Sequence, residues 1–333
     1  MQRHRVERST VREYLRTLGS GTEGGNGLGG RESVPAAPFA TVSGVLTTRP
    51  DLIREVDVHV PRIGIITTKS YEVMPNRGNR EPVIVEDAVG SFGNAVGLRN
   101  PGMKKGLEDL RRLRSEHTMR ALLNVSLSGK SPEDFMTLAA AFSEVADLLE
   151  LNFSCPHAAA GYGMSIGSDA DTVAGYVRAV RGVTDRPLFA KLTPNVENIG
   201  EIARAAVEAG ADGLVAVNTV GPDRFVEPHS GSDVLMNAKG NRGGRSGRGI
   251  RDIAVKKVRE IRSAVGPDVP IIGMGGVENG RDTAAMREAG ADIVGIGSLW
   301  ARIHPSQWAA FFEALAEDSV RNTMLATDFL LEE

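Results

Sequence analysis

Polar and ionisable side chains follow several short apolar runs of this chain, at the point where each run ends. When such runs form neighbouring parallel strands, their carboxyl ends meet at one face and the polar residues converge there. Lysines would bring fixed positive charge to that face, carboxamides would bring hydrogen-bond donors and acceptors, and a thiol would bring a group with a pKa near ~8.5. The candidate members of such a site are Lys69, Ser70, Asn152, Cys155, Lys191, Asn218 and Thr219.

Glycine clusters in the last third of the chain form a second layer of the candidate site. Two of them follow the final two apolar runs, where barrels of alternating strands and helices commonly hold a phosphate. Glycine lets backbone N–H groups approach phosphate oxygens without an intervening side chain. We therefore expect a phosphate-bearing ligand, which could be a sugar phosphate, a nucleotide or flavin mononucleotide (FMN). The clusters are Gly243–Gly247, Gly273–Val277 and Gly295–Ser298.

The elements that must position these residues alternate regularly along the chain. Short apolar runs suit buried parallel strands, and the longer amphipathic stretches between them suit covering helices. The alternation favours an α/β fold, a closed (β/α)8 TIM barrel with an N-terminal extension. The segment Glu208–Asp212 is echoed by Glu288–Asp292, each time where a helix ends and a strand begins. The predicted strands are 63–66, 121–125, 148–153, 188–192, 213–217, 269–273 and 293–296, and the predicted helices are 132–146, 169–183, 197–209, 251–264 and 280–289.

Length and composition set further limits. The chain has 333 residues, of which 41% are apolar, and a formal net charge of −3. That charge gives little attraction to nucleic acid or to an anionic membrane, and the lone Cys155 excludes an intrachain disulfide. We expect a cytoplasmic protein with a small-molecule substrate and with no metal, nucleic-acid or membrane partner. We expect a helix at 5–17 and a glycine-rich linker within 1–38, the barrel over 39–315 and a tail over 316–333.

Several of these stretches, taken in order, resemble the motifs of the class 1 dihydroorotate dehydrogenase family, and of class 1B in particular. They also resemble the pyrimidine-reducing domain of dihydropyrimidine dehydrogenase. The resemblance implies an FMN-dependent interconversion of a dihydropyrimidine and a pyrimidine, with oxidation of dihydroorotate to orotate as the leading expectation. The motifs are Thr68–Ser70, Gly93–Gly102, Leu151–Pro156, Ala190–Val196, Asn218–Thr219, Gly243–Gly247 and Ile271–Val277.

The resemblance also implies a role for each candidate residue. Cys155 would be the general acid/base at one ring carbon while flavin N5 exchanges a hydride with the other, and Lys69 would lie between flavin and substrate. Lys191 would lie beside flavin N1 and O2, where reduced flavin gathers negative charge. The implied substrate ligands are Asn94, Asn152, His157, Asn218 and Thr219. The implied flavin contacts are Ser43, Lys69, Ser70, Asn124, Asn152, Lys191 and Val217, with Gly247, Gly275, Gly276, Gly297 and Ser298 around the phosphate.

One position departs from the orotate-forming pattern. These enzymes usually carry a substrate asparagine after the Cys-Pro pair, whereas this chain has His157, as in dihydropyrimidine dehydrogenase. His157 could be a substrate ligand, a second proton carrier or a solvated loop residue. The alternative functions are therefore reduction of uracil- or thymine-like rings, or a flavin-binding subunit that needs a partner. From another class, Cys155 could be a covalent nucleophile on a nucleotide, as in inosine-monophosphate-dehydrogenase-like barrels.

The sequence leaves open the route by which electrons leave the flavin, with NAD(H) through a partner, fumarate or another molecule as the acceptor. One cysteine cannot hold an iron–sulfur cluster, and no Gly-x-Gly-x-x-Gly pattern opens a helix. If NAD(H) is the acceptor, an electron-transfer subunit must carry the additional centres. A cysteine at position 155, rather than a serine, argues against the quinone-linked class. We also expect the chain to form a homo-oligomer.

Overall fold

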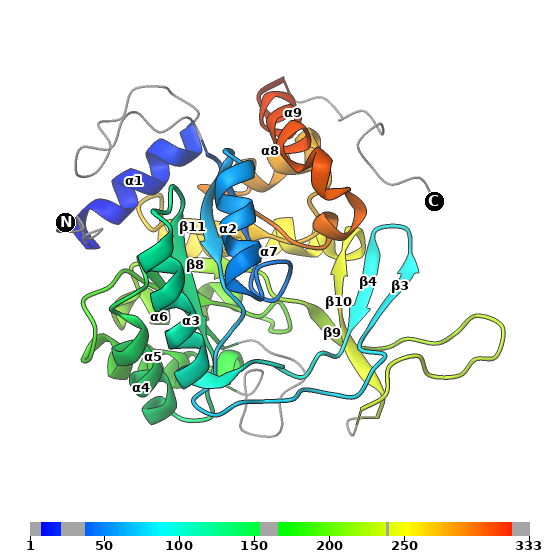
Figure 1. Ribbon diagram of the computed structural model, residues 1–333, viewed down its shortest axis with the longest axis horizontal. Helices are drawn as coiled ribbons and strands as arrows, with labels where there is room; N and C mark the ends of the chain where they lie inside the picture. Colours follow the sequence, from blue (N-terminus) through cyan, green and yellow to red (C-terminus); the bar gives the residue numbers. More distant parts are fainter. Residues whose placement is uncertain (1–7, 21–36, 154–165, 238–239, 322–333) are drawn as a thin grey trace.

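Parallel strands close into an eight-stranded barrel in the computed structural model, which describes residues 8–20, 37–153, 166–237 and 240–321 (Figure 1). Around the barrel the strand order is β1-β12-β11-β8-β7-β6-β5-β2. This order confirms the predicted (β/α)8 architecture. The barrel strands are β1 (Phe39–Thr41), β2 (Ile63–Thr67), β5 (Leu122–Leu127), β6 (Leu148–Asn152), β7 (Leu188–Lys191), β8 (Gly213–Ala216), β11 (Ile271–Met274) and β12 (Ile293–Ile296).

Amphipathic helices cover the outside of the barrel, and their apolar faces pack against the outward-facing side chains of the strands. Four of them begin after a residue whose side-chain oxygen accepts a hydrogen bond from the backbone N–H three residues on, namely Ser131, Asp169, Asn198 and Asn279. These caps satisfy N–H groups that the first turn leaves without partners, so they fix where each helix starts. The helices are α2 (Pro50–His59), α3 (Gly102–Glu116), α4 (Pro132–Phe142), α5 (Ala170–Arg181), α6 (Ile199–Glu208), α7 (Arg251–Val265), α8 (Gly280–Glu288) and α9 (Trp308–Arg321).

The strand β1 and the helices α2, α3 and α9 were not predicted from the sequence. β1 has three residues, too few to show a periodic pattern. In α3 the buried positions Gly102, Gly106, Leu110 and Leu113 form a narrow stripe among charged residues, and two of them are glycines. Little apolar surface therefore marks this helix in the sequence, although it packs against α2 and α4.

The repeated Glu-Ala-Gly-Ala-Asp segment ends in an aspartate that joins two strands to a helix. The carboxylate of Asp292 accepts hydrogen bonds from the backbone N–H of Ile271 at 2.8 Å and from the Arg262 guanidinium at 2.7 Å. The same arrangement recurs at Asp212 and at Asp147. Each aspartate thus accepts a hydrogen bond from an N–H at the start of the neighbouring strand and ties that strand to an arginine from the preceding helix. The repeated sequence segment therefore marks a repeated contact, in which an aspartate joins a strand to an arginine at the amino end of the barrel.

A four-stranded antiparallel sheet stands beside the barrel, in the order β3-β4-β10-β9, and it was not predicted (Figure 1). It is built from the long connections that follow the barrel strands β2 and β8, so it lies at the carboxyl face. In its register Gly247 faces Ser91, and Gly244 faces Asn94. The sheet thereby brings two motifs together that lie about 150 residues apart in the chain. Its strands are β3 (Ile84–Ala88), β4 (Ser91–Asn94), β9 (Val220–Arg224) and β10 (Arg242–Gly247).

The N-terminal extension forms the helix α1 (Arg8–Ser20), three residues later than the helix predicted at 5–17. Its side chains Val11, Leu15 and Leu18 are buried and belong to the apolar cluster inside the barrel. Arg8 pairs with Asp212 at 2.8 Å, just before β8. The helix therefore covers the amino end of the barrel, opposite the face where the polar strand ends converge.

The last helix, α9, crosses the position 315 at which the barrel was expected to end. Among the described residues, none of the helices combines the length and the apolar character needed to cross a membrane.

Candidate active site

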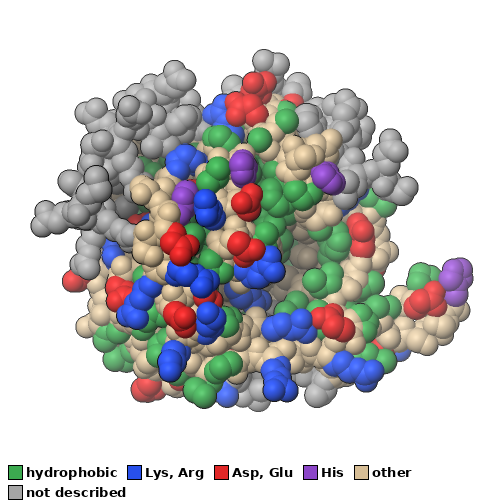
Figure 2. Space-filling view, viewed as in Figure 1, with side chains coloured by type: hydrophobic (Ala, Val, Ile, Leu, Met, Phe, Trp, Pro, Cys, Tyr) green, Lys and Arg blue, Asp and Glu red, His purple; other side chains and the backbone are tan. Residues whose placement is uncertain are grey.

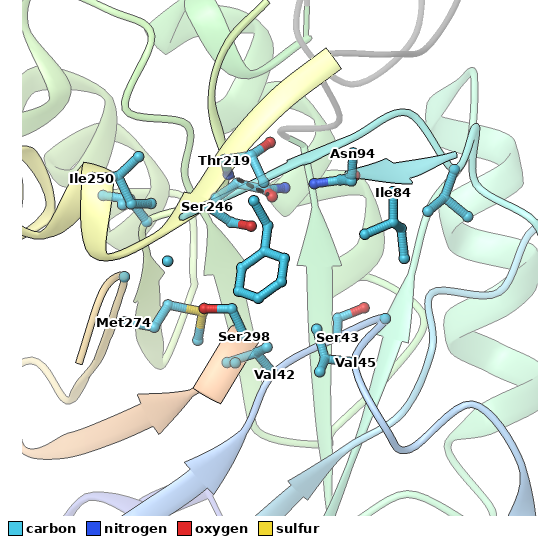
Figure 3. A pocket seen from close by; sticks show the side chains of 18 of the residues that line it. Val42, Ser43, Val45, Ile84, Asn94, Thr219, Ser246, Ile250, Met274 and Ser298 are labelled. Atoms are coloured by element: carbon cyan, nitrogen blue, oxygen red, sulfur yellow. Dashed lines mark hydrogen bonds between the residues drawn. The ribbon is translucent and has the colours of Figure 1, made fainter. Parts of the chain in front are cut away.

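A cavity of about 270 Å³ opens at the carboxyl face of the barrel, between the strand ends and the antiparallel sheet. Figure 2 shows the molecule hollowed near its middle, between these two parts. In Figure 3 the side chains of Asn94 and Thr219 lie across the cavity from those of Val42 and Ser298. Nearly all the described residues that were predicted for the site line this cavity, namely Ser43, Lys69, Ser70, Asn94, Asn152, Lys191, Val217, Asn218, Thr219, Gly247, Gly275, Gly276, Gly297 and Ser298.

Three predicted site residues do not appear among those that line the cavity. Asn124 lies deeper in the barrel, fully buried, where its amide donates a hydrogen bond to the Thr67 hydroxyl at 3.2 Å. Its Oδ1 has no hydrogen-bond partner among the described residues. Cys155 and His157 lie outside the residues that the structure describes.

Hydrogen bonds between side chains hold the polar wall of the cavity in place. The hydroxyls of Ser43 and Ser70 are 2.9 Å apart, and the Asn152 amide donates to the Ser70 hydroxyl at 3.0 Å. The Asn218 amide in turn donates to Asn152 Oδ1 at 3.2 Å. The ends of β2, β6 and β8 and the loop after β1 are therefore linked through one network, which fixes the side chains before a ligand arrives.

Two lysines bring positive charge to this wall. Lys191, at the end of β7, is only 3% exposed and still lines the cavity. Its ammonium lies 3.7 Å from the carboxylate of Glu150 on β6. Lys69 follows β2 and lies against Gly44, where an added Cβ would come within 3.1 Å of its Nζ. The polar wall can thus stabilise negative charge that develops on a bound ring.

The opposite wall has an apolar part, and next to that part it consists mainly of glycine backbone. Val217, Met274 and Val277 supply apolar surface, and the glycines of the β10, β11 and β12 ends follow. At Gly276 the backbone has φ +74°, and an added Cβ would lie 2.8 Å from the Gly247 carbonyl oxygen. Only glycine fits such a close approach, so the two glycine segments present bare backbone to the cavity. Exposed backbone N–H groups of this kind can donate hydrogen bonds to the oxygens of a phosphate.

Asn195 supports the part of the cavity wall that carries Asn218 and Thr219, and it was not singled out as a site residue from the sequence. Its amide donates to the Thr219 carbonyl at 3.1 Å, and its Oδ1 accepts from the Gly221 N–H at 2.9 Å. Asn195 therefore holds the segment that carries Asn218 and Thr219. The signal in the sequence was its place in the Ala190–Val196 motif, two residues after Thr193, whose hydroxyl bonds it.

Glu72 supports the loops on the opposite side of the cavity, and it too was not singled out from the sequence. Its carboxylate accepts hydrogen bonds from the amides of Asn76 and Asn100, each at 2.8 Å. Burial raises the pKa of Glu72 above its ordinary value, while the two amide hydrogen bonds act in the opposite direction. The contact ties the loop after β2 to the residues that enter α3, and the segment from Asn94 to Leu98 lies between them.

The cavity therefore offers a charged and amide-rich wall, an apolar wall and a backbone cradle to one ligand. Such a combination fits a flat aromatic ring system with a polar edge and a phosphate tail, with room for a second small polar ring against the asparagines.

Comparison with known proteins agrees with this geometry. Residues 36–316 match the family described as dihydroorotate dehydrogenase. The chain is 41% identical over 261 residues to the catalytic subunit of dihydroorotate dehydrogenase B (NAD(+)) from Pyrococcus abyssi, covering 78% of this chain and 83% of that protein. It is 42% identical over 235 residues to the same subunit from Methanothermobacter thermautotrophicus, covering 71% and 74%. It is 43% identical over 236 residues to that of Methanocaldococcus jannaschii, again covering 71% and 74%. The chain belongs to the dihydroorotate dehydrogenase family.

Proposed function

We propose that this chain is a flavin-dependent oxidoreductase that oxidises dihydroorotate to orotate, with FMN in the cavity at the carboxyl face. The observation that carries the proposal is the convergence of two lysines, a carboxamide cluster and a glycine cradle on one cavity. These are the groups that a flavin's polar edge, a pyrimidine ring and a phosphate each require. Relatives named as dihydroorotate dehydrogenase catalytic subunits support the choice of substrate.

The residues present fit FMN. The apolar wall of Val217 and Met274 suits the flat ring, and the glycines around Gly276 leave backbone space that a phosphate can use. Lys191 and Ser70 would lie along the polar edge. When bound, the flavin would supply a hydride acceptor for the substrate.

The chain's own residues would bind the substrate and manage its proton. Asn94, Asn152, Asn218 and Thr219 present donors and acceptors that match the alternating N–H and C=O groups of a pyrimidine. Oxidation removes a hydride from one ring carbon and a proton from the next. On the family resemblance we assign the proton to the Cys155 thiolate, and we place Lys69 between the two rings.

Electrons would leave through a partner. The relatives are named as catalytic subunits of NAD(+)-linked enzymes. We propose that this chain likewise delivers electrons to a separate subunit. The expected homo-oligomer stays a prediction.

A second candidate function rests on a single residue. His157 follows Cys155-Pro156 where orotate-forming enzymes usually carry an asparagine, and this triplet resembles dihydropyrimidine dehydrogenase. The alternative substrate is therefore a uracil- or thymine-type ring.

An anaerobic titration tests both candidates. Purified protein should show a flavin absorbance spectrum that dihydroorotate bleaches, whereas dihydrouracil should leave it unchanged. The reverse selectivity would favour the second candidate, and a colourless protein that FMN does not restore would contradict both. Cys155→Ser should keep the yellow colour but slow the bleaching, because the hydroxyl is a much weaker base. Unchanged bleaching would refute the assignment of the base.

A further inference from the structure

Glu150 is a charged residue at the centre of a barrel strand. It lies on β6 and is fully buried. Its neighbours Leu149 and Leu151 belong to the core outside the barrel, whereas Leu148 belongs to the apolar cluster inside it. Because side chains alternate along a strand, Glu150 points into the barrel, on the same face as Asn152. Its carboxyl group therefore lies beneath the cavity floor.

The contacts of this carboxyl group differ between its two oxygens. Oε1 accepts a hydrogen bond from the Ser126 hydroxyl at 2.7 Å and lies 3.7 Å from Lys191 Nζ. Oε2 is buried and has no hydrogen-bond partner within the described part of the chain. A direct bond between an ammonium and a carboxylate is about 2.7–2.9 Å long, so the Lys191 ammonium is paired with Glu150 by charge rather than by a close hydrogen bond. Its N–H donors are left for a ligand in the cavity.

A buried ammonium without a counter-charge is costly, since burial removes its hydration. Glu150 supplies a counter-charge from below the cavity, and Lys191, which is 3% exposed, lines the cavity above it. The same carboxylate offsets part of the positive charge that a ligand in the cavity experiences. A cation favours the more negative, reduced state of a bound flavin, and an anion disfavours it.

We propose that Glu150 is a positioning residue which pairs with Lys191 by charge at the cavity floor and, by offsetting the positive charge of that ammonium, lowers the reduction potential of the bound flavin. This inference rests on the proposed function, because it requires a flavin in the cavity. A lower potential makes the reduced flavin a stronger electron donor, which suits transfer onward to a nicotinamide acceptor.

The test is the midpoint potential of the bound flavin, measured by anaerobic equilibration with reference dyes. Glu150→Gln keeps the shape and the acceptor for Ser126 but removes the charge. We expect it to favour the reduced flavin at least tenfold over wild type, which for a two-electron couple is a rise of about 30 mV. Glu150→Asp, which keeps the charge, should restore most of the wild-type potential. Ser126→Ala is the matched control, since it alters the same buried contact without changing any charge, and its potential should stay near wild type.

Two results would overturn the inference. One is a Glu150→Gln protein with bound flavin and an unchanged potential, and the other is an equal rise in Ser126→Ala. If Glu150→Gln does not fold, the comparison moves to Lys191→Met and the double variant Lys191→Met/Glu150→Gln. The double variant must then have the higher potential, and equal potentials refute the role of the Glu150 charge. Failure of the proposed function would look different, because the wild-type protein would then bind no flavin or would leave dihydroorotate unoxidised.

Discussion

Replacing Gly276 by alanine should weaken flavin binding by more than its effect on the backbone alone explains. The new Cβ would lie 2.7 Å from the Arg251 Cβ and 2.8 Å from the Gly247 carbonyl oxygen. Both contacts involve backbone or atoms next to it, so the segments must move apart. Forcing extra atoms into such a site costs about 1–3 kcal/mol, and the left-handed backbone at φ +74° adds about 1–2 kcal/mol for an alanine.

Gly231→Ala separates these two costs. Gly231 also has a left-handed backbone, at φ +67°, but an added Cβ there would meet no atom within 4 Å. Both variants should lose stability through the backbone term, whereas only Gly276→Ala distorts the cradle. If the distorted segment binds the phosphate of FMN, the cost of 1–3 kcal/mol corresponds to about a 5- to 150-fold rise in the Kd for FMN. Titrating FMN into the apoproteins by flavin fluorescence measures this, beside thermal unfolding of both. Equal FMN affinities in the two variants would refute the assignment of this segment to the phosphate.

Three further predictions concern residues that support the site or the barrel. Asn195→Ala removes the two hydrogen bonds that brace residues 219–221, worth about 1 kcal/mol each, so KM for dihydroorotate should rise by up to about 30-fold while the flavin spectrum is kept; an unchanged KM would contradict the bracing role. Asp292→Asn should lower the free energy of unfolding by about 2 kcal/mol, measured with urea. The control Asp268→Asn, at an exposed position, should change that free energy by less than about 0.5 kcal/mol, and equal effects would contradict the role of the Asp292 contacts. Because burial raises the pKa of Glu72, the folded state binds its proton more tightly than the unfolded chain does. Stability of wild type relative to Glu72→Gln should therefore fall as pH rises from the ordinary glutamate pKa to the raised one, and parallel stability curves would exclude this.

The barrel could be predicted because most of its elements carry their own signals. Strands such as β8 and β12 are continuous apolar runs, and helices such as α8 start after a capping side chain at the expected residue. The antiparallel sheet lacks such signals. Its β10 has the sequence Arg-Gly-Gly-Arg-Ser-Gly, and β3 is largely exposed, so neither shows the alternation of a half-buried strand. β4 and β10 pair although they lie about 150 residues apart in the chain, and such pairing leaves no local pattern in the sequence.

The cavity lining was predictable where a polar residue ends an apolar strand, as at Lys191 and Asn152. Residues that support the lining, such as Asn195 and Glu72, could not be separated from ordinary polar loop residues. Their importance comes from which backbone groups they meet, and that depends on the folded loops. Asn124 was expected from the family resemblance to contact the flavin; it is fully buried and is not among the residues that line the cavity, so its contact with a ligand stays a prediction.

The inner surface of the barrel is divided into a polar half and an apolar half, and this division orients whatever binds above it. Going round the closed sheet, the inward positions nearest the cavity are polar on four neighbouring strands, β2, β5, β6 and β7, and apolar or glycine on β8, β11 and β12. A ring with one polar edge would bind more tightly with that edge over the polar half, because buried donors and charges without partners cost free energy. The glycine segments proposed to hold the phosphate lie at the ends of β10, β11 and β12, beyond the apolar half. The barrel strands and the glycine segments, one of which belongs to the antiparallel sheet, would therefore contact different ends of a ligand that carries such a ring and a phosphate. A buried glutamate within the run Leu148–Asn152 contributes to the polar half, and a charge in an otherwise largely apolar strand therefore indicates a functional role.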